Sequence, residues 1–430
     1  MPETLSPCRR APVLVEHSSA EHRCGKRRLH YLPALDGLRG VAVAVVVATH
    51  LQPLPGLVAG QVAMDVFFGL SGFLITALLT SELAANGSVS LRRFYLRRAR
   101  RLFPALWLFL GVWLGVVILF GSNAWMTSVP GSSQGAPQRL LPALEGVAGA
   151  LTYLTNWAIA YHAFTGYVAI GHLWSLAVEE QFYLLWAPVA LLLFRRRSAA
   201  VVAVIGGATA SLAAAILLFH NGSGGSRIYF GTDTRAAALL LGALVALAWD
   251  AGLADRALSG FGGTILLALS AIALAWSAVG MKHPGPWTPW LGGWIAASIA
   301  APAVVGGIVA RPSGIVARLL SRPVLRYLGS RSYGIYLWHY LWATWLHSLE
   351  IFRFPLVVGA SLICAEASWQ LVEAPLRRSR SKADSKESLP NLPPGWAMRS
   401  RVKTDSHIGG LWNTAGAVKG TGRSVEPQER

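Results

Sequence analysis

Apolar residues follow one another along this chain in long blocks that short basic clusters separate. A helix that crosses a bilayer needs about 20 mostly apolar residues, because each residue rises about 1.5 Å through a hydrocarbon core about 30 Å thick. Eleven blocks approach that length, over residues 36–52, 62–83, 102–121, 145–163, 172–194, 198–219, 235–250, 261–280, 288–310, 332–349 and 352–373. The pattern predicts an all-α fold, a polytopic bundle of transmembrane helices.

The basic clusters between these blocks indicate how many of them cross the membrane, since Lys and Arg accumulate in cytoplasmic loops. We place the basic N-terminus and the basic loop 91–101 inside. If block 145–163 crosses, the arginines at 195–197 and 311–331 fall outside; if it does not, both clusters fall inside. We therefore predict about ten spans in the cell membrane, with both termini cytoplasmic. Block 145–163 becomes an interfacial or re-entrant helix on the outer side.

Composition and charge agree with a membrane protein. Only 13% of the residues are charged, against about 25% in soluble proteins. The net charge of +18 is spread over short loops and both tails, which argues against nucleic acid as a partner. Cys8, Cys24 and Cys364 lack the spacing of a metal site, and no metal is predicted. We expect disordered cytoplasmic tails at 1–30 and 379–430 and one transmembrane domain at 31–378.

Arg39 and His50 stand out inside the first apolar block. Eleven helical steps return to nearly the same face and cover about 16 Å along the axis. Pro53 and Pro55 end this helix, which places His50 toward the outer half of the membrane and Arg39 toward the inner half. Histidine can take a proton near neutral pH, and arginine can hold a phosphate or a carbonyl oxygen. Ionisable groups in a span are costly and suggest function, although a structural pair is the alternative.

Acidic residues and a second histidine mark two further spans. Asp65 enters the second span from the outer side, where it could orient His50 or simply begin a helix. His172 and Glu179 are seven residues apart and share a helix face. Glu179 and Glu180 are adjacent carboxylates inside an apolar block, so at least one should face a cavity or a cation. A structural ion pair is the alternative for these two.

The remaining candidates lie near the ends of spans. Arg98 and Arg101 would share one helix face and could clamp phosphates, or they could set topology and contact anionic lipids. Asp233 and Arg235 open the sixth span from the outer side, where a local ion pair is the alternative. His339 follows an aromatic run that could equally form an interfacial belt.

These motifs, in this order, resemble the acyltransferase family 3 membrane proteins. The matching segments are 35–40 with His50, 65–76, 94–101, 172–183, 233–235, 336–339 and 373–376. The resemblance covers about 31–378. By resemblance, Arg39 and His50 match the family's essential Arg-x10-His pair, and Arg98 with Arg101 its Arg-x-x-Arg motif. The chain departs from the family at Ala237, where an aspartate is frequent, and at Ala374, where Glu-Arg-Pro is more usual.

The resemblance implies an integral-membrane O-acyltransferase. It would take an acyl group from cytoplasmic acyl-CoA and deliver it to a hydroxyl of a carbohydrate, glycolipid, cell-wall polymer or macrolide-like acceptor. We expect catalytic roles for His50, Arg39, Asp65 and Glu179, and acyl-CoA binding by Arg98 and Arg101. The residues expected at the acceptor are His172, Glu180, Asp233, Arg235 and His339. The alternatives are a transporter or flippase for a lipid-linked or glycosylated substrate, and an inactive scaffold of the same fold.

Overall fold

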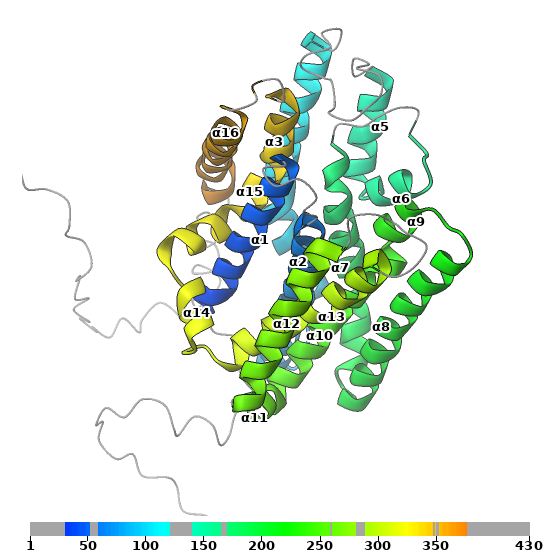
Figure 1. The fold of residues 1–430 in the computed structure, drawn as a ribbon, viewed down its shortest axis with the longest axis vertical. Helices are drawn as coiled ribbons and strands as arrows, with labels where there is room; N and C mark the ends of the chain where they lie inside the picture. The colour runs from blue at the N-terminus through cyan, green and yellow to red at the C-terminus, as the bar shows by residue number, and fades with distance from the viewer. Residues whose placement is uncertain are drawn as a thin grey trace, which may run out of the picture. The chain divides into compact units, whose positions relative to one another are not determined.

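A computed structural model describes residues 31–51, 59–120, 140–164, 170–258, 260–280, 289–346, 349 and 352–375 (Figure 1). Within these ranges the chain forms helices and no strand, so the all-α prediction is confirmed. The predicted tails at 1–30 and 379–430 lie outside the described residues, as do Pro53 and Pro55. The helix before these prolines ends at Leu51.

Ten long helices correspond to the predicted spans. They are α1 (Pro33–Leu51), α2 (Ala59–Asn86), α3 (Leu91–Phe120), α7 (Trp174–Leu193), α8 (Arg197–His220), α10 (Thr232–Asp250), α12 (Phe261–Gly280), α13 (Pro289–Ala310), α15 (Pro323–Trp345) and α16 (Arg353–Ser368). Short helices join them: α5 (Leu140–Leu151), α6 (Thr155–Ala160), α9 (Gly225–Phe230), α11 (Leu253–Leu258) and α14 (Ile315–Leu320). A 3-10 turn at Gly171–Leu173 precedes α7, and a π turn at Trp369–Glu373 follows α16.

Nine helices in the described part of the chain are long and apolar enough to cross a membrane. The predicted span that falls outside this set is α15, which has 23 residues but carries Arg326 and Arg331 in its first half. Because α15 packs along α1, it belongs to the same bundle. The polytopic helical bundle is therefore confirmed.

The weakest apolar block, 145–163, does not form one long helix. It is divided between α5, with 12 residues, and α6, with 6, and Tyr153 between them has a positive φ of 55°. Twelve residues rise about 18 Å, too little to cross the hydrocarbon core. The buried Asn156 side chain donates to the Phe230 carbonyl and the Thr232 hydroxyl and accepts from Gln181. These bonds attach α6 to the segment that precedes α10 and to α7.

Glycines allow two pairs of helices to cross at very short range. A Cβ atom added at Gly37 on α1 would lie 1.7 Å from the Leu320 carbonyl oxygen, and one added at Gly72 on α2 would lie 1.8 Å from that of Leu239 on α10. No other residue fits such a contact, which is typical of small residues between membrane helices. Gly37 and Gly72 thus allow α1 and α2 to pack directly against neighbouring backbones in the bundle.

The consecutive spans alternate in direction, so the turns α2–α3, α7–α8 and α13–α15 lie at one end of the bundle. Figure 1 draws α11 and α14 at the lower end of the view and α5 at the upper end. The turns at the lower end carry the arginines at 195–197 and 311–326. The preference of basic residues for the cytoplasm assigns this end to the inside, and we call it the inner end.

Candidate active site

The described residues form, among others, two cavities within the bundle, and each gathers residues from helices that are distant in sequence. The inner cavity has a volume of about 580 Å³ and lies among α1, α2, α3, α7 and α15. Its polar and charged lining comprises Asp36, Arg39, Ser71, Arg98, Arg101, Ser175, Glu179, Ser330, Ser332 and Glu373, with several tyrosines. The outer cavity, of about 530 Å³, is lined by His50, His162, His172, Trp174, Tyr229, Phe230 and Tyr340, among others.

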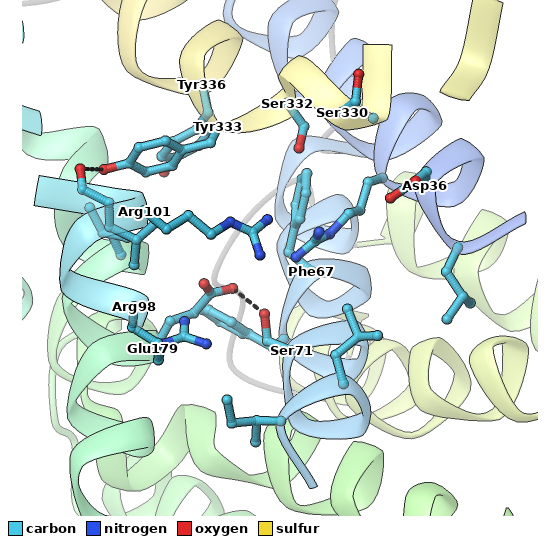
Figure 2. A pocket seen from close by; sticks show the side chains of 18 of the residues that line it. Asp36, Phe67, Ser71, Arg98, Arg101, Glu179, Ser330, Ser332, Tyr333 and Tyr336 are labelled. Atoms are coloured by element: carbon cyan, nitrogen blue, oxygen red, sulfur yellow. Dashed lines mark hydrogen bonds between the residues drawn. The ribbon is translucent and has the colours of Figure 1, made fainter. Parts of the chain in front are cut away.

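Three arginines line the inner cavity, together with the acids Asp36, Glu179 and Glu373. Arg98 and Arg101 extend from α3 into it, as Figure 2 shows, and Arg39 lines it from α1. Arg98 donates to the Glu180 carboxylate at 3.1 Å, and its guanidinium lies 3.5 Å from the ring centroid of Tyr183. Glu180 is absent from the linings of both cavities. In this geometry Glu180 orients Arg98, and its expected role at the acceptor stays a prediction.

Glu179 faces the inner cavity beside Arg98, and its carboxylate points toward Ser71 (Figure 2). It accepts a hydrogen bond of 2.9 Å from the Ser71 hydroxyl. Although seven residues separate Glu179 from His172, the two line different cavities, because two helical turns separate them along the bundle. The contact of Ser71 with Glu179 joins residues 108 positions apart, so no local sequence pattern indicates it.

Histidines and a tyrosine form one side of the outer cavity. His50 is at its edge, with Nδ1 2.9 Å from the Val46 carbonyl oxygen and 3.3 Å from Nε2 of His339. The His172 ring stacks on Tyr340, with centroids 4.8 Å apart. Within the described residues, no group of three histidine, cysteine or acidic side chains is arranged to hold a metal ion.

Met64 and Tyr336 line both cavities and stand between them. The Tyr336 hydroxyl donates to the backbone carbonyl of His172 and lies 2.6 Å from the Ser175 hydroxyl, which in turn donates to it. These bonds fix the Tyr336 ring between the two cavities, and we call Met64 and Tyr336 the barrier. The aromatic run that contains Tyr336 therefore faces the interior, and the interfacial belt is excluded for this residue. Its spacing of three from His339 is the signal that sequence offered.

Asp65 does not have the partner that the sequence suggested. It lies 3.6 Å from Nη1 of Arg235 and accepts a hydrogen bond of 3.2 Å from Ser298. The predicted orientation of His50 by Asp65 is therefore wrong in this geometry, since the ring nitrogen of His50 contacts His339 instead. The reason is that Asp65 is buried against α10 and α13.

Asp233 and Arg235, which the sequence suggested as a local ion pair, bind different partners. Asp233 binds Arg227 through two hydrogen bonds of 3.0 and 2.6 Å. Arg235 is buried, and its guanidinium carbon lies 4.9 to 5.6 Å from the ring centroids of four aromatic residues, Phe68, Trp174, Tyr229 and Trp294. Neither residue lines a cavity. The prediction of a local Asp233–Arg235 pair is wrong, because each residue binds another partner. Acceptor contact by these two stays a prediction.

The predicted residues thus separate into two groups. Those that line a cavity are Arg39, Arg98, Arg101 and Glu179 inside and His50 and His172 outside. Those outside both linings are Asp65, Glu180, Asp233, Arg235 and His339. The arrangement joins a cavity with three arginines, which can bind phosphates, to a cavity that offers an imidazole.

Comparison with known proteins identifies the family. Residues 32–367 match the family model described as an acyltransferase domain. A peptidoglycan O-acetyltransferase of Listeria monocytogenes is 32% identical over 367 residues, which are 81% of this chain and 56% of that protein. A Bacillus subtilis protein provisionally named a peptidoglycan O-acetyltransferase is 31% identical over 94% of this chain and 64% of its own length.

A Staphylococcus aureus protein provisionally named an O-acetyltransferase is 29% identical over 83% of this chain and 59% of its own length. The chain therefore spans less than two thirds of the length of these relatives. No solved structure matches the chain at a significant level. The match to the family model covers most of the chain and most of the residues that line the two cavities, and the protein belongs to acyltransferase family 3.

Proposed function

We propose that this protein is a membrane O-acyltransferase that transfers an acetyl or other short acyl group from acyl-CoA to a hydroxyl of a cell-envelope carbohydrate. One observation carries the proposal: Arg39 and His50, on a single helix, line two cavities that share Met64 and Tyr336. A phosphate-binding side and a proton-accepting side then meet across one barrier. The printed names of two relatives support a peptidoglycan-type acceptor.

The inner cavity is the donor site in this proposal. Coenzyme A is rich in phosphate, and arginine binds phosphate oxygens through two parallel hydrogen bonds. Arg39, Arg98 and Arg101 supply such donors at the cytoplasmic end, where acyl-CoA is made. The acyl end of the thioester would extend toward Met64 and Tyr336, and from there toward His50.

The outer cavity is the acceptor site. His50 takes the proton of the acceptor hydroxyl while the hydroxyl oxygen attacks the thioester carbonyl carbon. The new C–O bond forms, the C–S bond breaks, and the sulfur leaves as thiolate. The thiolate receives the proton from His50, so the products are an ester and the CoA thiol. In the carrier variant, the His50 nitrogen first bonds the acyl carbon, releases CoA, and then passes the acyl group to the acceptor.

The test is transfer by the purified full chain. Labelled acetyl-CoA is mixed with cell-wall carbohydrate from cells that lack the gene, and label on the carbohydrate is measured. We expect His50→Ala to lower transfer by about 10² to 10⁴-fold, the usual contribution of a general base. His220→Ala, at the exposed end of α8 and outside both cavities, is the control. Transfer by His50→Ala at the wild-type rate would refute the assignment.

Two further measurements separate the alternatives. Arg101→Gln removes a charge that lines the inner cavity, so KM for acetyl-CoA should rise. A transporter without acyl chemistry would release no CoA thiol from the wild-type protein. Omitting the acceptor distinguishes the routes of His50: only a carrier leaves label on the protein in a single turnover.

A further inference from the structure

His339 lies directly behind His50 and is shielded from both cavities. Its side chain has no exposed surface, and it is absent from the linings of the two cavities. Its ring centroid is 5.0 Å from that of His50. His50 lines the outer cavity and His339 lies against it, outside both linings; acceptor contact by His339 stays a prediction.

The backbone fixes which nitrogens of this pair carry hydrogen. A carbonyl oxygen only accepts hydrogen bonds. Nδ1 of His50 lies 2.9 Å from the Val46 carbonyl oxygen, and Nδ1 of His339 lies 2.7 Å from that of Tyr336. Both Nδ1 atoms must therefore be protonated.

The same protonation leaves one lone pair on each neutral ring. Nε2 of His339 is the unprotonated nitrogen of its ring, so it can accept from Nδ1 of His50 at 3.3 Å, and the single hydrogen on that Nδ1 is then shared with the Val46 carbonyl oxygen. Nε2 of His50 is then the unprotonated nitrogen of the other ring. Both routes proposed for His50, base and acyl carrier, need a free lone pair of this kind.

We propose that His339 is a positioning residue that holds the orientation of His50 and supports the tautomer that the Val46 carbonyl sets. The proposal rests on the proposed function of His50. It assigns to a neutral imidazole the role that a carboxylate has in the Ser-His-Asp arrangement, where the third group orients the base. In a span this choice avoids burying another unpaired charge. Asp65, the acid expected in this role, pairs with Arg235 instead.

The surroundings restrict the His50–His339 pair from several sides. Tyr340 meets the His50 ring edge-on at 5.1 Å, and His172 lies 5.7 Å from His339 between ring centroids. Tyr336, whose carbonyl holds His339, is anchored through its own hydroxyl. Contacts thus run from Tyr336 through His339 to the ring of His50.

Two substitutions at one position separate positioning from structural support. His339→Asn places an amide near Nδ1, so it keeps the donor to Tyr336 and loses the acceptor for His50. His339→Gln places an amide oxygen near Nε2 and keeps that acceptor. We expect kcat to fall about 100-fold in the Asn variant, a typical cost of misplacing a catalytic group, and to remain within about tenfold of wild type in the Gln variant.

The KM for acetyl-CoA should be unchanged in both variants, because His339 lines neither cavity. Equal kcat values for Asn and Gln, or a higher KM at unchanged kcat, would overturn the proposal. The tautomer is measured separately in the wild-type protein by ¹⁵N NMR of labelled histidine, with His50→Ala for assignment. A protonated Nε2 in neutral His50 would also overturn it. Because the NMR result needs no activity, a wild-type protein that transfers nothing would refute only the proposed function.

Discussion

The buried pair of Asp65 and Arg235 gives the sharpest test of which charges are structural. Each side chain is at most 1% exposed, and the nearest nitrogen and oxygen are 3.6 Å apart. We consider Asp65→Leu, Arg235→Met and the double variant. Each single change leaves one charge buried without its partner, whereas the double change removes both charges and keeps similar side-chain volumes.

The expected size of the effect follows from the distance. With an effective dielectric constant of about 20, two unit charges at this separation attract by about 4.6 kcal/mol. Removing one partner of a buried pair costs about 3–5 kcal/mol, while replacing both by apolar groups is often nearly neutral. Four aromatic rings surround Arg235 and can pack against methionine. We expect each single variant to lose about 3–5 kcal/mol and the double variant less than either.

The assay is a double-mutant cycle on the free energy of unfolding, measured by SDS titration of the purified protein in mixed micelles. Acetyl transfer is measured on the same four proteins. The double variant should retain transfer, because neither residue lines a cavity. Additive losses would refute the ion-pair argument. A double variant that is stable but transfers no acetyl group would instead indicate a catalytic role for Asp65.

Two other predictions concern the packing of α2 and the barrier. Gly72→Ala should lower the free energy of unfolding by about 3 kcal/mol, because its Cβ would lie 1.8 Å from the Leu239 carbonyl oxygen. Gly111→Ala, where nothing lies within 4 Å of the added Cβ, is the matched control in the same unfolding assay. Equal stabilities of the two variants would contradict the close crossing of α2 and α10. Tyr336→Ala should join the two cavities and admit water to the thioester. CoA thiol release without acceptor should then rise severalfold over Tyr336→Phe, which keeps the ring, and no rise would contradict the barrier.

The helices were predictable because hydrophobicity alone determines which segments enter the membrane. Block 261–280 coincides with α12, and 288–310 differs from α13 by one residue. The prediction was least accurate where helices extend beyond the apolar core. Helix α3 begins eleven residues before its predicted block, because helical hydrogen bonding continues through the basic segment while arginines reach toward water.

The site was only partly predictable, because residue spacing defines a face of one helix and not its neighbour. The sequence correctly predicted that Arg39 and His50 lie on one helix. The partner of Asp65 is 170 residues away, and the nearest histidine of His50 is 289 residues away. Such pairs depend on the order of helices in the bundle, which the glycine crossings determine and which no local pattern contains.

The packing of α1 restricts how the acyl group can pass between the cavities. Gly37 lies against the Leu320 backbone and Gly40 against that of Leu325, so α1 has no space to move toward α15. Arg39 and His50 are therefore held at a fixed separation of about 16 Å by one helix. Passage must then come from side chains in the barrier. Met64 is flexible, and Tyr336 is held by hydrogen bonds that a rotation of the ring would break. Opening therefore depends on the barrier side chains, while the donor and acceptor groups stay in place.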